Sequence, residues 1–76
     1  MVFTEERAQF EFIRRADRGR FVGEFLANTR RPARVVATAD GASSTSPAYS
    51  VLVEFDREER DLVLGMATSC AGLEAA

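Results

Sequence analysis

The chain has 76 residues, of which 46% are hydrophobic and 29% are charged. This length allows one hydrophobic core, and the composition is that of a folded globular chain. The single cysteine, Cys70, excludes an intramolecular disulfide, and the lack of histidine excludes the usual zinc sites. We therefore expect one domain over residues 1–76, with a core completed by a second subunit or by a partner protein.

Sequence features also predict where the protein works. No apolar run approaches the roughly 18 residues of a membrane span, and residues 1–6 lack the basic and apolar regions of a signal peptide. We expect a cytoplasmic protein without membrane contact. All ten basic residues are arginine, which indicates the mutational bias of a GC-rich genome. We expect a bacterial or phage protein.

Charge is divided unevenly along the chain. Residues 1–39 hold eight arginines and five acids, whereas residues 40–76 hold two arginines and seven acids, so the halves carry about +3 and −5. The two halves can attract each other within one molecule, or head to tail between two copies. The arginines of the first half therefore do not by themselves require an anionic partner.

The first segment fits two structures. Residues 4–6 (Thr-Glu-Glu) offer an N-cap followed by acids, which favours a helix over residues 5–17. Against this, Ala8, Phe10 and Phe12 alternate as in a strand that would lead into a hairpin turn. We expect the helix.

A second helix is predicted over residues 20–29. Arg30-Arg31-Pro32 ends it, because the residue before a proline avoids helical dihedral angles. The apolar residues on one face of this helix are Phe21, Val22, Phe25 and Leu26.

Two strands follow, over residues 34–39 and 48–55. The first is rich in β-branched residues and ends at the turn pair Asp40-Gly41. The second alternates with period two, and we expect the two to pair as an antiparallel sheet. A two-stranded sheet is marginal in water, so we expect pairing across a twofold axis in a homodimer. The residues of this expected dimer strand are Tyr49, Val51, Val53 and Phe55.

The last segment decides the fold class. Asp56 can cap a helix, which would carry an apolar stripe and a small-residue face; a returning strand over residues 61–68 is the alternative. We favour the helix, and hence an α+β fold with N-terminal helices, a short antiparallel sheet and a C-terminal helix. The stripe comprises Leu62, Val63, Met66, Ala67, Cys70 and Leu73, and the small-residue face comprises Gly65, Thr68, Ser69 and Gly72.

No residue pattern indicates catalysis. Without histidine, acid–base chemistry would depend on Tyr49 or on the carboxylates of residues 54–61. Those carboxylates fit better as a helix cap and a solvated first helical turn, and Cys70 fits as a small core residue. We expect no catalytic residue, no metal site and no cofactor.

Arginines cluster between residues 14 and 34, where seven arginines and two acids sum to about +5. Their forked donors suit phosphate groups, and this predicts an anion-binding or nucleic-acid-binding patch. The alternative is a surface that docks the acidic half of the chain. The residues of the predicted patch are Arg14, Arg15, Arg18, Arg30, Arg31 and Arg34.

Part of the chain resembles a known family. Phe25-Leu26, then residues 33–41 (Ala-Arg-Val-Val-Ala-Thr-Ala-Asp-Gly), then Ser46-Pro47, then residues 61–64 resemble the opening of flavin- or deazaflavin-binding split-barrel proteins, the pyridoxamine-phosphate-oxidase-like group. The resemblance implies a mostly β partial split barrel that binds flavin and is oxidoreductase-like. In that family basic residues hold the flavin phosphate after the position of Thr68, where this chain has no basic residue.

These observations lead to one main hypothesis and two alternatives. The main hypothesis is a small non-enzymatic protein that acts through protein–protein interaction as a homodimer. The alternatives are a reduced flavin-binding split barrel and a nucleic-acid binder that uses the arginine patch.

Overall fold

The computed structural model describes residues 4–30, 33–41 and 48–74. Strands and helices follow one another in the order β-α-β-β-α-β, and a single 3-10 turn, η1, precedes the second helix. The elements are β1 (Glu5–Phe12), α1 (Arg15–Asn28), β2 (Arg34–Gly41), β3 (Ala48–Asp56), η1 (Arg57–Glu59), α2 (Arg60–Ser69) and β4 (Leu73–Glu74).

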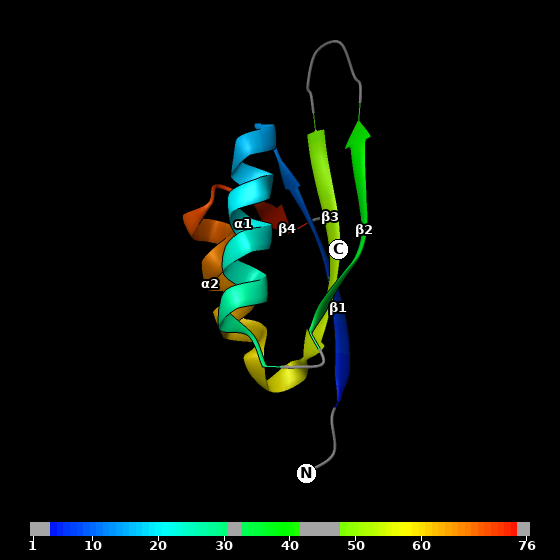
Figure 1. Ribbon diagram of the computed structural model, residues 1–76, viewed down its shortest axis with the longest axis vertical. Coiled ribbons are helices and arrows are strands. Elements are labelled where there is room, and N and C mark those ends of the chain that lie inside the picture. Colours follow the sequence, from blue (N-terminus) through cyan, green and yellow to red (C-terminus); the bar gives the residue numbers. More distant parts are fainter. Residues whose placement is uncertain (1–3, 31–32, 42–47, 75–76) are drawn as a thin grey trace.

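The four strands form one antiparallel sheet in the order β2-β3-β1-β4. Figure 1 shows both helices on the same side of this sheet. This order of elements and strands is the split β-α-β, or ferredoxin-like, arrangement. The predicted α+β class is therefore confirmed.

Residues 5–12 form strand β1, so the predicted first helix is wrong. β1 pairs with β3 along its whole length, from Glu5 opposite Asp56 to Phe12 opposite Tyr49. Ala8, Phe10 and Phe12 are buried while the residues between them are exposed. On a helix Ala8 and Phe12 would share one face while Phe10 would point to the opposite side, so only a strand brings all three into one core.

Helix α1 begins five residues before the predicted start and ends at Asn28, close to the predicted end. Its buried side chains are Phe21 and Phe25, which are one helical turn apart and face the sheet. Leu26 is 55% exposed, because its position next to Phe25 turns it away from the core. The apolar face of α1 is therefore narrower than the sequence predicts.

Strands β2 and β3 confirm the predicted hairpin, but β3 cannot be the expected dimer strand. It lies between β2 and β1, so its backbone is hydrogen-bonded on both edges. Val51, Val53 and Phe55 are fully buried and Tyr49 is half-buried. The Val51, Val53 and Phe55 side chains belong to the core of one chain and are not available to a second.

The last long segment forms helix α2, so the alternative of a strand over residues 61–68 is wrong. The Asp56 carboxylate accepts a hydrogen bond from the backbone N–H of Glu58 at 3.1 Å, so it caps the 3-10 turn η1 that leads into α2. Helix α2 itself follows Glu59, which makes no side-chain capping hydrogen bond. Val63, Met66 and Ala67 are buried, whereas Leu62 turns to solvent.

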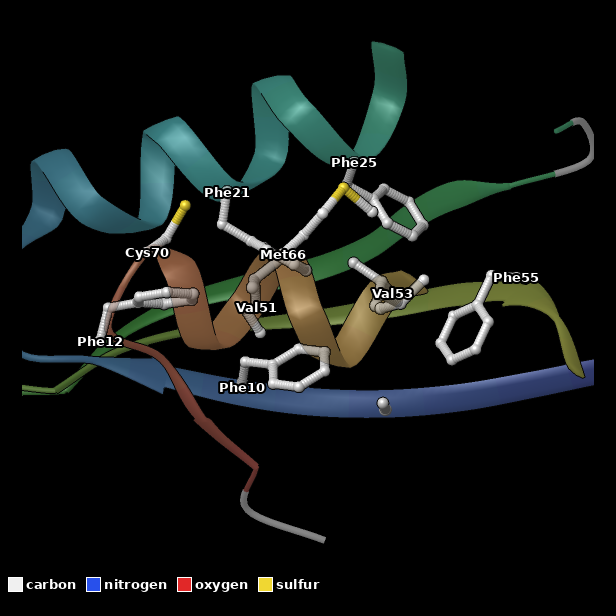
Figure 2. Close-up of a cluster of buried hydrophobic side chains, with 12 residues drawn as sticks. Phe10, Phe12, Phe21, Phe25, Val51, Val53, Phe55, Met66 and Cys70 are labelled. Atoms are coloured by element: carbon white, nitrogen blue, oxygen red, sulfur yellow. The ribbon is translucent and has the colours of Figure 1, made fainter. Parts of the chain in front are cut away.

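The core lies between the helices and one face of the sheet (Figure 2). A chain of ring contacts joins the layers: Phe21 lies 5.1 Å from Phe10, 5.5 Å from Phe12 and 5.9 Å from Phe25, between ring centroids. Among the described residues, no element covers the other face of the sheet, which we call the open face. The core residues are Ala8, Phe10, Phe12, Phe21, Phe25, Val51, Val53, Phe55, Val63, Met66, Ala67 and Cys70.

Candidate functional site

The structure separates the arginines that the sequence groups together. Arg14 and Arg15 lie at the start of α1, and Arg30 lies beyond its end, about 21 Å along a helix of 14 residues. Arg34 lies on the open face of the sheet in β2. The described arginines therefore do not form one patch, and Arg31 lies outside the described residues.

Several of these arginines are paired with acids of the second half of the chain. Arg18 Nη1 lies 2.6 Å from Asp40 Oδ1, and the Arg18 guanidinium also stands 5.5 Å from the centre of the Tyr49 ring. Arg30 lies 3.5 Å from a carboxylate oxygen of Glu58 and 3.8 Å from one of Glu59. The basic and acidic halves thus dock within one molecule, as the alternative interpretation expected.

Glu54 is the centre of a charge cluster on the open face. Its carboxylate accepts hydrogen bonds from Arg7 Nε at 2.9 Å and from Arg34 Nε at 3.0 Å, and the residue is 5% exposed. The hydrogen bond from Arg34 lowers the pKa of Glu54 below its usual range, Arg7 adds to this, and burial opposes it. Glu54 is therefore ionised at neutral pH and holds the two arginines in place.

Glu59 has a structural role at the junction of the helices. Both of its carboxylate oxygens accept a hydrogen bond from the backbone N–H of Arg30, at 3.0 and 3.2 Å, although Glu59 lies 29 positions further along the chain. The side chain is buried. It ties the start of α2 to the end of α1, so the spacing of the two helices is held at this end.

A groove of about 570 Å³ lies between the two helices. Its apolar surface comes from Leu62 and Met66 of α2. Between them lies Gly65, where an added Cβ would have no other atom within 4 Å, so the groove is open at this position. Glu24 on α1 and Asp61 on α2 place a carboxylate on each wall. The lining residues are Glu24, Asn28, Asp61, Leu62, Gly65, Met66 and Ser69, none of which is basic.

Cys70 closes the core next to this groove. Its Sγ lies 3.3 Å from Glu24 Oε2 as a hydrogen-bond donor, and the residue is 2% exposed. Burial raises the pKa of the Cys70 thiol, and the hydrogen bond to the Glu24 carboxylate and its negative charge raise it further. The thiol is therefore held protonated, which is the opposite of what a nucleophilic cysteine requires.

We expect Cys70 to resist thiol reagents in the folded protein. At pH 7 its reaction with a disulfide reagent should be on the order of 100-fold slower than in the protein unfolded by denaturant, because the thiolate is suppressed and access requires local opening. Absorbance of the released thiolate measures both rates. Complete labelling of the native protein at the unfolded rate would contradict the buried, protonated thiol.

The groove was not predicted from the sequence, although one signal for it was present. Gly65 and Ser69 lie four positions apart on the predicted small-residue face of α2, and both line the groove. The wall contributed by Glu24 depends on where α1 packs against α2, and no local pattern indicates that contact.

The part of the chain that the structure describes contains neither a cluster of metal ligands nor a membrane-spanning helix. No group of three or more metal-ligating side chains comes together in residues 4–30, 33–41 and 48–74. Neither described helix is long and apolar enough to cross a membrane.

In the comparisons with known proteins, no family model, no curated protein and no solved structure matches this chain significantly.

Proposed function

We propose that this protein is a non-enzymatic interaction module of the cytoplasm, acts as a homodimer, and binds a basic amphipathic segment of a partner protein between α1 and α2. The observation that supports this proposal is the groove with an apolar floor and one carboxylate on each wall. Helix-in-groove binding of this kind is a recurring mode of peptide recognition.

The chemistry of the groove selects the occupant. An apolar side chain of the partner can enter over Gly65, where the missing side chain leaves space, and contact Met66. Lysine or arginine side chains on either side of it can then pair with Glu24 and Asp61. An acidic segment would bring like charges to both walls, which disfavours its binding.

Nucleic-acid binding and flavin binding remain predictions from the sequence. Arg18, Arg30 and Arg34 are engaged by acids of the same chain, so the arginine patch supports nucleic-acid binding less than its sequence indicates. Flavin binding rests on the family resemblance alone, and in this chain residues 61–64, which match the third strand of that family, lie in α2.

Binding in the groove can be tested with two designed peptides. The probes are 15-residue helices of leucine and lysine with an apolar stripe, and the same peptides with glutamate in place of lysine. We expect the basic peptide to shift the backbone amide resonances of Gly65 and Ser69 in NMR titrations. Gly65→Leu, which fills the groove, should weaken this binding at least about tenfold, which is the effect of 1.4 kcal/mol.

A matched control separates occlusion from a general effect on the helices. Gly19 lies on α1 outside the groove, also with no atom within 4 Å of an added Cβ, so Gly19→Leu should bind the basic peptide like the unmodified protein. Equal affinity for the basic and acidic peptides, or equal losses with Gly65→Leu and Gly19→Leu, would refute the groove as the binding site.

A further inference from the structure

The middle of the open face is ordered into three rows of residues that lie side by side across the strands. A row with two acids, Glu5 and Asp56, lies beyond one end of these rows, and an uncharged row with Ala48 and Gly41 lies beyond the other. In an antiparallel sheet, directly paired residues point to the same face. Row A comprises Arg7, Glu54 and Arg34, row B comprises Gln9, Leu52 and Ala37, and row C comprises Glu11, Ser50 and Ala39, each in the order β1, β3, β2.

These rows differ in charge. Row A has two arginines and one glutamate, which gives +1; row B is neutral; and row C has Glu11 as its one charged residue, which gives −1. Arg7 and Arg34 each keep more than half of their side chain exposed despite their contacts with Glu54 and, for Arg7, a second contact with Glu5 at 3.4 Å. Glu11 is exposed and has no ion pair among the described residues. A positive row and a negative row thus lie on either side of a neutral one.

We propose that two copies of this chain pack face to face through their open faces, related by a twofold axis that crosses the strands along row B. Such an axis reverses the strand direction and keeps the strand order, so row A of each copy faces row C of the other. This inference rests on the homodimer of the proposed function and specifies the surface that forms it.

The charge map selects this axis over the other simple choice. An axis along the strands would place row A on row A, row C on row C and the acids Glu5 and Asp56 on those of the second copy, so like charges would meet along the face. The axis across the strands instead places Glu5 and Asp56 over the uncharged row of Ala48 and Gly41. The axis across the strands brings Arg7 of each copy over Glu11 of the other. Packed sheets lie about 10 Å apart, a gap that an arginine and a glutamate reaching toward each other can span.

Uncharged residues occupy the centre of this interface. Leu52 and Ala37 of row B meet the same residues of the second copy, so apolar contact lies on the axis and the charges lie to either side. Leu73 of β4 pairs with Glu11 and is 74% exposed. In the dimer it lies beside Arg7 of the second copy, which buries an otherwise solvated leucine.

The first experiment changes charge on row C. Light scattering coupled to size exclusion should give twice the 8.4 kDa chain mass for the unmodified protein. Glu11→Arg sets arginine against Arg7 of the second copy at two symmetric places, so the dimer dissociation constant should rise at least about tenfold. Glu58→Arg makes the same charge change at an exposed site on η1, and it should leave the mass at twice that of the chain.

The second experiment tests the position of the axis. Gln9→Cys in a Cys70→Ala background places one thiol of each copy next to the axis, so a bis-maleimide with a spacer of about 10 Å should join the two chains. Gly19→Cys on α1, in the same background, should not be joined because the helices lie on the outer sides of the dimer. The joined fraction is read from denaturing gels.

The outcomes separate this inference from the proposed dimer itself. A monomer at all concentrations would refute both. A dimer that is unaffected by Glu11→Arg and is not cross-linked through Gln9→Cys would overturn the open-face arrangement while leaving the homodimer intact. Thermal melts of each variant show that it is folded. If Glu11→Arg fails to fold, the cross-link at Gln9→Cys decides.

Discussion

Replacing Phe21 with alanine is expected to lower the free energy of unfolding by about 3–5 kcal/mol. Phe21 is fully buried, and its ring contacts those of Phe10, Phe12 and Phe25. Removing it opens a cavity between α1 and the sheet that these rings cannot fill without leaving their own contacts. Urea denaturation followed by circular dichroism measures the change.

For a chain of this size the loss is a large part of its total stability, which is about 5–15 kcal/mol for folded domains in general. Leu26→Ala is the control, because Leu26 lies on the same helix and is mostly exposed. It should change the free energy of unfolding by less than about 1 kcal/mol. Similar losses for the two variants would mean that α1 does not pack on the sheet through Phe21.

The second large effect is expected for Gly72→Ala, which should destabilise the protein by about 2–3 kcal/mol. A Cβ at this position would lie 2.5 and 2.6 Å from two ring carbons of Phe12 and 3.2 Å from the carbonyl oxygen of Ala67. The Phe12 ring is buried and cannot swing away. The backbone N–H of Gly72 also donates a 2.7 Å hydrogen bond to that carbonyl. The backbone at Gly72 therefore cannot move away from the Phe12 ring without losing this hydrogen bond.

The same substitution at Gly65 is expected to have the opposite sign. Gly65 lies inside α2, with no atom within 4 Å of an added Cβ. Gly65→Ala should therefore raise the free energy of unfolding by about 0.5–1 kcal/mol through helix propensity. Thermal denaturation of the two variants in parallel checks this contrast. Equal changes in both would show that the contact between Gly72 and Phe12 has no energetic consequence.

Local patterns were sufficient to predict most elements of the fold. The period-two alternation of residues 49–55 and the apolar stripe of residues 62–70 identify β3 and α2, because each pattern has one face that can be buried. Residues 5–12 contain conflicting signals. The capping pattern at Thr4 is worth about 1 kcal/mol, whereas a strand brings Phe10 and Phe12 into the core, so burial decides.

Cys70 shows how a candidate site depends on the fold. From the sequence it is a small apolar residue near the end of a helix, and its burial could be predicted from the stripe alone. The carboxylate of Glu24, 46 positions earlier in the chain, completes its surroundings. The same contact between α1 and α2 creates the groove, so neither could be located before the packing of the helices was known.

By itself the sequence determined that the chain contains a β hairpin and a C-terminal helix, and that its two halves carry opposite charge. Only the tertiary structure decided that residues 5–12 insert as a strand between β3 and β4, and that Arg7 and Arg34 meet at Glu54. The reason is physical. Periodicity and charge are local properties of a sequence, whereas strand register and helix packing bring together residues that are far apart in the chain.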